Sequence, residues 1–284
     1  MKKIYSFLFV LLFISISAQD LQKIAKEITD EGITLYRSEM ASWYGTDIFL
    51  ENYDNRENIA GYFSYIDNGV PKCVFFSKEN KIIGTVAFPT NYDVKDAKLD
   101  LKERVFTPTE KDYFDLRQKT IDKIQNDSIF KRYENTNFNI IPIITQKEKK
   151  VYIITGTNLN NLVLIGNDYL LNFNKKNEIT KVQALHKSLI SHKIVDEEVG
   201  KTFAASHSNV LEDWQFITPT DICTLMLYQK FTDWENYTVV SKKYTSLWNT
   251  KSNFLVIMKT HVLKKINEDK KKRDSERSQQ ESPE

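Results

Sequence analysis

Cysteine, glycine, proline and histidine are all scarce in this sequence. Its 284 residues include only 2 Cys, 8 Gly, 6 Pro and 4 His. Two cysteines cannot form the dense disulfide framework of a small secreted scaffold. The sequence also lacks a Gly-rich phosphate loop, a Gly-x-Ser-x-Gly turn and a Cys-x-x-Cys pair. It therefore carries no signature of the common nucleotide-binding, serine-hydrolase or thiol-redox classes.

An excess of charge of one sign is absent as well. Lys and Arg total 40 and Asp and Glu total 38, which gives a formal net charge of +2. Dedicated nucleic-acid binders normally present a strongly basic face. We therefore expect no nucleic-acid partner.

No apolar run is long enough to cross a membrane, but a shorter one stands near the N-terminus. A basic start is followed by the apolar residues 4–14 and then by small residues up to Ala18. This run falls well short of the roughly 20 residues of a membrane span, and the layout is that of a secretory signal. We predict that residues 1–18 are removed between Ala18 and Gln19. The mature protein is then periplasmic or secreted and does not span a membrane.

The C-terminal segment, residues 264–284, is charged and polar, with no apolar residue after Ile266. Such a segment cannot bury enough surface to offset the entropy of ordering it. Acidic residues flank the basic run at 270–273, which favours a solvated tail over a nucleic-acid or membrane patch. We predict a disordered charged tail.

Cys73 and Cys223 lie 150 residues apart, and the exported compartment permits a disulfide. Two separate buried thiols are the simpler interpretation, since free Cys is commonly buried. The sequence alone leaves the pairing open.

The rest of the chain predicts an α+β protein, with an antiparallel-rich mixed sheet flanked by a few helices. Apolar residues at helical spacing predict a helix over 20–42, and Ser42 to Thr46 breaks that pattern. Two capping motifs, beginning at Thr107 and Thr218, predict helix starts. We place an N-terminal region at 19–105 and a C-terminal region at 106–263. Strands are expected at 62–66, 72–76, 82–88, 140–145, 151–155, 162–165, 169–173, 179–185, 202–205, 237–241, 244–248 and 254–258.

One short group of residues, between His207 and Asp221, has the pattern of a possible metal site. An apolar strand runs into His207, a loop follows, and a helix begins at Thr218 with Asp221 in its first turn. This resembles the JAB/MPN metalloprotease-like family, in which two histidines and an aspartate bind zinc and a glutamate serves as acid and base. The resemblance covers at most residues 110–262. It implies that His207 and Asp221 are zinc ligands and that Thr218 lines the site.

The sequence departs from that family pattern in three ways. Asn209 stands where the second histidine belongs, and a neutral amide oxygen is a poor substitute for imidazole on zinc. The loop before Asp221 is one residue longer than in the family. No glutamate in the preceding strands clearly fits the acid/base role, and the nearest, Glu178, lies in a polar turn. The constellation thus indicates a degenerate copy.

Three simpler or competing interpretations stand beside it. Thr218 and Asp221 could serve only as a helix cap. His186 or His192 could instead complete a metal set with His207 and Asp221. Asp168, in a turn with Asn167, could bind calcium but is more simply a turn residue.

The function that follows is that of an exported, non-catalytic interaction or binding protein, whose partner is a protein or an envelope component. Its surface would lie near Trp43, Tyr44 and Trp214, which could equally be core residues. The alternative is a zinc-dependent periplasmic hydrolase of peptide or amide bonds, with zinc held by His207, Asp221 and His186.

Overall fold

The structure is a computed structural model. It describes the backbone of residues 2–196, 200–201, 204–208 and 214–280 and the side chains of 19–194 and 214–276. Helices combine with several mostly antiparallel sheets, so the predicted α+β class is confirmed. Within the described residues, no helix has the length and apolar character needed to span a membrane.

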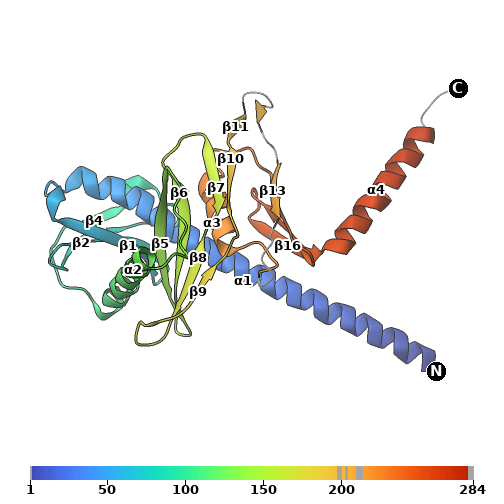
Figure 1. Ribbon diagram of the computed structural model, residues 1–284, viewed down its shortest axis with the longest axis horizontal. Coiled ribbons are helices and arrows are strands. Elements are labelled where there is room, and N and C mark those ends of the chain that lie inside the picture. Colours follow the sequence, from blue (N-terminus) through green and yellow to red (C-terminus); the bar gives the residue numbers. More distant parts are fainter. Residues whose placement is uncertain (1, 197–199, 202–203, 209–213, 281–284) are drawn as a thin grey trace.

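A single long helix, α1 (Lys2–Asn52), runs through the molecule, and its N-terminal part projects beyond the sheets (Figure 1). The predicted helix at 20–42 is confirmed, but the predicted break at Ser42 to Thr46 is wrong. Gly45 lies inside the helix, and its missing side chain leaves room for Cys73, whose Cβ an added Cβ would meet at 2.6 Å. Gly32 likewise lets α1 approach Ile222, which a Cβ would meet at 2.7 Å. Both glycines mark close packing rather than a helix end.

The N-terminal sheet has the order β1-β2-β3-β4 and is antiparallel throughout. The β1–β2 turn contains Asn68 and Gly69, both at positive φ, as its Asp-Asn-Gly sequence predicts. A short 3-10 turn precedes the sheet and another lies in the polar stretch before β4. The elements are β1 (Ile59–Asp67), β2 (Val70–Ser77), β3 (Ile82–Ala87), β4 (Lys98–Asp100), η1 (Arg56–Asn58) and η2 (Val94–Asp96).

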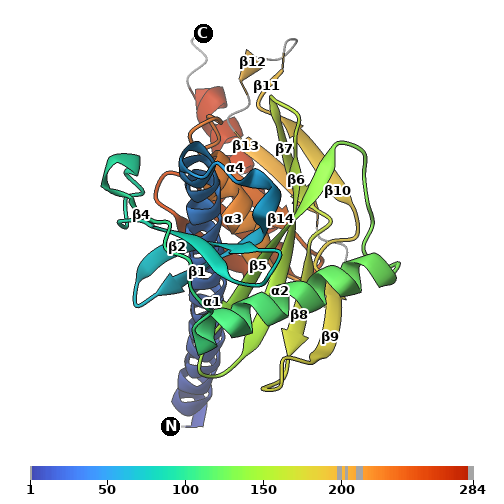
Figure 2. The ribbon, with the colours of Figure 1, turned by 90° about the vertical axis from the view of Figure 1, so that its left-hand side faces the viewer.

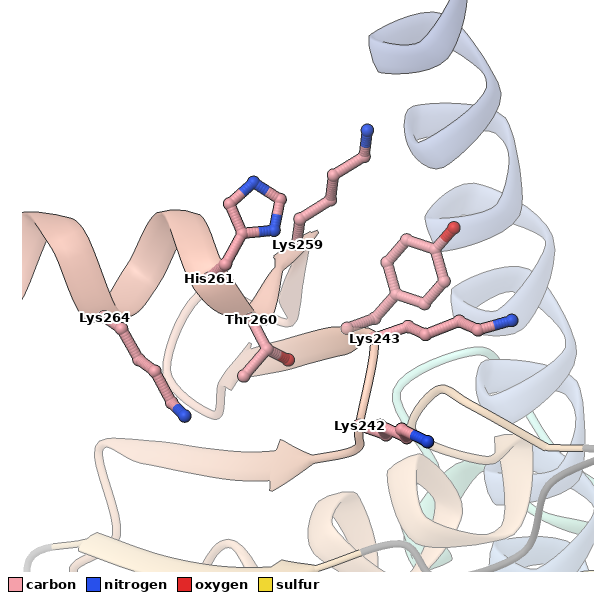
Figure 3. A pocket seen from close by; sticks show the side chains of 7 residues that line it. Lys242, Lys243, Lys259, Thr260, His261 and Lys264 are labelled. Carbon is pink, nitrogen blue, oxygen red and sulfur yellow. The ribbon is translucent and has the colours of Figure 1, made fainter.

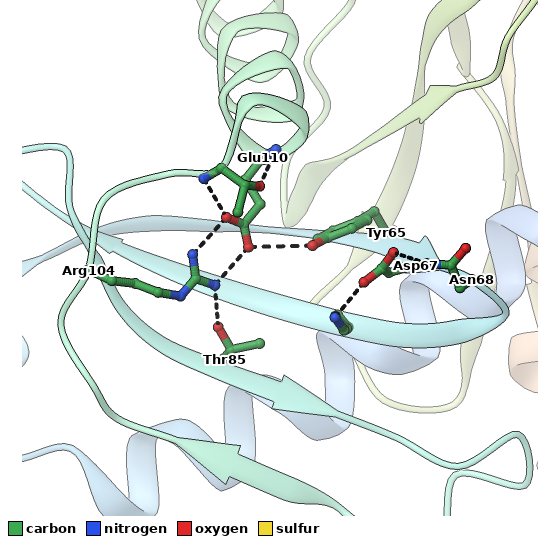
Figure 4. A network of polar contacts seen from close by, with 8 residues as sticks. Tyr65, Asp67, Asn68, Thr85, Arg104 and Glu110 are labelled. Atoms are coloured by element: carbon green, nitrogen blue, oxygen red, sulfur yellow. Dashed lines mark hydrogen bonds and ion pairs between the residues drawn. The ribbon is translucent and has the colours of Figure 1, made fainter.

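Helix α2 (Pro108–Asn126) begins at the predicted capping box. Thr107 Oγ1 accepts from Glu110 N at 3.2 Å, and Glu110 Oε2 accepts from Thr107 N at 2.8 Å. Arg104 donates to both carboxylate oxygens of buried Glu110, and Tyr65 donates to one of them (Figure 4). Burial acts to raise the pKa of Glu110, but the hydrogen bonds from Arg104 and Thr107 outweigh it and lower that pKa. This network fixes α2 on the N-terminal sheet.

The middle of the molecule contains a second four-stranded sheet of order β5-β6-β8-β9, covered by α2 (Figure 2). Its strands are β5 (Thr136–Ile144), β6 (Lys149–Thr157), β8 (Tyr169–Phe173) and β9 (Ile179–Ala184). Two small antiparallel pairs stand beside it. These are β7 (Leu162–Gly166) with β10 (Leu189–Lys193), and β11 (Val195–Asp196) with β12 (Gly200–Lys201).

The C-terminal sheet has the order β13-β14-β15-β16, and only its β13–β14 pair is parallel. Helix α3 (Pro219–Tyr228) connects β13 to β14 and packs on α1. The strands are β13 (Ala204–Ser208), β14 (Asn236–Val240), β15 (Tyr244–Asn249) and β16 (Phe254–Lys259). Most predicted strands are therefore found, with ends shifted by one to a few residues. Thr202 and Phe203 of the expected strand at 202–205 lie outside the described residues.

Helix α4 (Thr260–Gln280) leaves the C-terminal sheet and projects on the same side of the molecule as the start of α1 (Figure 1). Each residue from Lys264 to Glu276 is exposed, which agrees with the predicted solvated segment. Its disorder stays a prediction, and residues 281–284 lie outside the described part of the chain.

The largest core cluster joins α1 to both halves of the sequence. It contains Phe49 and Cys73 from before residue 105 and Tyr152 and Cys223 from after it. The two cysteines are buried and free, which agrees with two separate thiols. Burial raises the pKa of both thiols well above the ordinary value. The predicted division of the chain near residue 105 stays a prediction, because a shared core neither requires nor excludes it.

Candidate functional site

The start of α3 carries two of the residues singled out in the sequence, Thr218 and Asp221. Thr218 Oγ1 accepts from Asp221 N at 3.0 Å, and Asp221 Oδ2 accepts from Thr218 N at 2.9 Å. The capping box expected from the sequence is therefore present. It uses only one carboxylate oxygen of Asp221, so the cap does not account for the whole side chain.

The second oxygen of Asp221 faces His186, which lies two residues after the end of β9. Asp221 Oδ1 lies 3.0 Å from His186 Nε2, a hydrogen-bonding distance. The structure thus brings together two of the three residues named as metal ligands, although they are 35 positions apart in the sequence.

Asp168 joins them from the start of β8. Its Oδ1 accepts from Thr155 N of β6 at 2.9 Å, and its Oδ2 lies 3.7 Å from His186 Nδ1. Thr220 also hydrogen-bonds to this carboxylate. Sequence reasoning treated Asp168 as a turn residue, and the preceding Asn167 is indeed in a turn, with φ of 56°. The signal that was missed is the apolar sequence on both sides, which buries the turn.

The cluster of Asp168, His186 and Asp221 is almost closed to solvent. The exposed fractions of the three residues are 2%, 9% and 1%. Burial raises the pKa of Asp168 to about 6, although His186, Thr155 and Thr220 act to lower it. Burial acts to lower the pKa of His186, but the attraction of Asp221 and Asp168 outweighs it and the pKa is raised. The cluster can therefore hold a proton on the imidazole between two carboxylates, or a cation.

The other predicted residues lie elsewhere or outside the described side chains. His207 is part of β13, where it is in register with Val239, but its side chain lies outside the described side chains, and Asn209 lies outside the described residues altogether. His192 Nε2 is 3.1 Å from Tyr237 Oη, and its ring packs edge-on against Trp234. Exposed Glu178 accepts a hydrogen bond from Asn174 in the β8–β9 turn.

The aromatic residues considered as an interaction surface belong mostly to the packing. Trp43 is 37% exposed and meets Tyr228 edge-on at a centroid distance of 6.1 Å. Tyr44 and Trp214 are partly buried against the largest core cluster. They form no continuous exposed patch.

A lysine-lined pocket lies where α4 leaves the C-terminal sheet (Figure 3). Its volume is about 370 Å³. The β14–β15 turn, the end of β16 and the first turns of α4 supply its walls, and none of the described residues that line it is acidic. The lining residues are Lys242, Lys243, Tyr244, Lys259, Thr260, His261 and Lys264.

The backbone around this lysine pocket is tied together by hydrogen bonds. Thr260 N donates to Lys243 O at 2.9 Å, and Thr260 Oγ1 donates to Ser241 O at 3.0 Å. Ser241 in turn bonds Tyr244 through both its backbone and its side chain. Within the described side chains, none of the four lysines forms a salt bridge, unlike Lys150, which pairs with Glu31 and Glu148. The pocket therefore concentrates positive charge on an ordered frame.

Sequence reasoning missed this pocket because the lysines come from segments about 20 residues apart, and the near-neutral total charge conceals a local excess. The adjacent Lys242 and Lys243 in a hairpin turn were the available signal.

Comparison of the chain with protein-family models, with curated proteins and with solved structures gives no match. The resemblance to the JAB/MPN family therefore stays a hypothesis that depends on His207, Thr218 and Asp221.

Proposed function

We propose that the protein is exported and works outside the cytoplasm as a non-catalytic binding protein, and that its lysine pocket holds a phosphate-bearing envelope component. The observation that carries this proposal is the group of four lysines around one hollow, with no acidic residue in its wall. Lysine is a common point-charge ligand of phosphate. The pocket volume of about 370 Å³ suits a phosphorylated headgroup or sugar.

Export is supported by the layout of residues 1–18, in which a basic start and an apolar run are followed by small residues up to Ala18. Cleavage is expected between Ala18 and Gln19. Mass spectrometry of the mature protein would then give an N-terminus at Gln19, and an uncleaved chain in the cytoplasm would contradict the proposed location.

The absence of catalysis is supported by the burial of the Asp168–His186–Asp221 cluster. A hydrolytic metal centre keeps an open coordination position that substrate and water can reach. Here three side chains exposed by 9% or less face one another, and both aspartates also fix backbone amides. This arrangement suits a structural role.

The test of ligand binding compares wild type with Lys242→Gln/Lys243→Gln. The probes are inorganic pyrophosphate, measured by calorimetry, and vesicles of phosphatidylcholine with or without phosphatidylglycerol, measured by co-sedimentation. The control is Lys175→Gln/Lys176→Gln, which removes equal charge from the exposed β8–β9 turn. We expect wild type and control to bind equally, the pocket variant to bind about tenfold more weakly, and binding to weaken with salt.

The two probes distinguish the source of the phosphate. Binding of pyrophosphate alone indicates a soluble phosphorylated ligand, whereas binding only to anionic vesicles indicates a lipid headgroup. Binding of neither probe, or equal weakening in both variants, would overturn the assignment of the pocket.

The second candidate is a zinc-dependent hydrolase of peptide or amide bonds. It is favoured by one observation, the 3.0 Å approach of His186 Nε2 to Asp221 Oδ1. Its test is hydrolysis of an N-acetylated peptide amide by zinc-treated protein. Turnover that is lost in His186→Gln would support the hydrolase and overturn the non-catalytic proposal.

A further inference from the structure

Asp168, His186 and Asp221 come from three separate parts of the fold: the residue before β8, the second residue after β9, and the first turn of α3. Only the folded chain brings them together, because 18 and 35 positions separate them along the sequence. Each offers one ligand atom, and these atoms all lie within 4.8 Å of one another. No local sequence motif would reveal this set.

Both carboxylates are oriented in the same way. One oxygen of each accepts a backbone amide, Thr155 N for Asp168 and Thr218 N for Asp221, both at 2.9 Å. The other oxygen of Asp168 lies 3.7 Å from His186 Nδ1, and the other oxygen of Asp221 lies 3.0 Å from His186 Nε2, so the two carboxylates approach different nitrogens of the ring. Metal ligands in proteins are commonly oriented by such outer hydrogen bonds.

We propose that Asp168, His186 and Asp221 bind one divalent transition-metal ion, which fastens the start of α3 to the β6–β8 region. This site goes beyond the proposed binding function and does not depend on it. One imidazole and two carboxylates suit ions such as Zn²⁺ or Mn²⁺ better than Ca²⁺ or Mg²⁺, which prefer oxygen ligands throughout.

The distances fit such an ion after a small adjustment. Zinc bonds of about 2.1 Å in a tetrahedral arrangement place ligand atoms about 3.4 Å apart. The present separations range from 3.0 Å between His186 Nε2 and Asp221 Oδ1 to no more than 4.8 Å. Movements of up to about 1.4 Å close the set, with a rotation of the imidazole that turns one ring nitrogen toward both carboxylates.

The metal would be structural because the set is enclosed. It would act on the junction that the capping box of α3 already defines, so its binding energy would add to folding stability. Substrate turnover is not part of the inference.

The test measures metal content and thermal unfolding of purified protein after chelation and dialysis against Zn²⁺. The variants are Asp168→Asn and His186→Gln, with His192→Gln as control, because His192 contacts Tyr237 and Trp234 instead. We expect about one zinc ion per chain and a zinc-dependent rise in Tm for wild type and control. The zinc content per chain and the zinc-dependent rise in Tm should each fall at least fivefold in the two site variants.

Asp168→Asn is nearly isosteric and retains an oxygen for Thr155 N, and circular dichroism reports whether each variant folds. If a site variant does not fold, the decisive measurement is the imidazole NMR spectrum of wild type, in which zinc must shift the His186 signals. Absence of stoichiometric zinc in folded wild type, or full zinc content in a folded site variant, would overturn the site.

Discussion

At the scale of single residues, the buried carboxyl group of Glu39 gives the stability of this protein a dependence on pH. Glu39 of α1 is 4% exposed and lies among the thiols and tyrosines of the largest core cluster. Burial raises the pKa of its carboxyl from 4.5 to about 7, although a hydrogen bond from Asn139 acts to lower it. The folded protein therefore holds a proton on Glu39 that the unfolded chain releases at lower pH.

This proton predicts a loss of stability with rising pH. Between about pH 4.5 and 7 the folded state binds more protons than the unfolded state, so the free energy of unfolding decreases across that window. The shift corresponds to about 3 kcal/mol. Glu39→Gln should flatten the contribution, so that its difference from wild type grows toward pH 8. Urea unfolding at pH 5 and pH 8 measures it, and a pH-independent difference would contradict the assigned pKa.

At the scale of elements, the close contact between α1 and α3 is a main feature of the fold. Helix α1 approaches α3 at Gly32, where an added Cβ would lie 2.7 Å from Ile222 Cβ and 3.1 Å from Pro219 O. Glycine in a helix usually costs about 1 kcal/mol relative to alanine. Here that cost is outweighed by the contact it permits.

Gly32→Ala should accordingly destabilise the protein by about 1–3 kcal/mol, the reverse of its effect in an exposed helix. Ile222→Ala removes one of the two clashing carbons, so Gly32→Ala should cost less in that background. A double-mutant cycle from denaturant unfolding measures the coupling. Strictly additive changes would mean that α1 and α3 do not meet at this point.

The sequence predicted the local features of these elements better than the contacts between them. Most of the strands, the Asp-Asn-Gly turn and both capping boxes are local features that the sequence predicted, whereas β4, β10, β11 and β12 were not expected. The sequence did not predict that α1 continues past Ser42, because the close approach of Cys73 to Gly45 is a tertiary contact that local sequence does not show. The buried cluster was half anticipated: His186 and Asp221 were named, but Asp168 was assigned to a turn. Its role depends on Thr155 and His186, which no sequence spacing connects to it.

For the whole molecule, α1 is the element that unites the parts. Its Leu35 and Phe49 belong to the largest core cluster, while its Ala25 and Ile28 belong to the cluster of the C-terminal sheet. Both clusters also contain residues of α3, so neither is confined to one stretch of the chain.

We expect from this shared core that the described body unfolds in one transition. Helix content by circular dichroism and tryptophan fluorescence should give the same midpoint, because Trp248 and α1 belong to one packed unit. Calorimetry provides the independent check. Two separated transitions would instead support the division of the chain near residue 105 predicted from the sequence.

Thr260 lines the lysine pocket and is also the first residue of α4, so the pocket lies at the base of this long helix. At 1.5 Å per residue, the 21 residues of α4 extend about 30 Å from that point. A rotation of about 10° at Thr260 displaces the far end by about 5 Å. A small adjustment of the pocket walls is thereby amplified into a displacement as large as the spacing between two neighbouring strands.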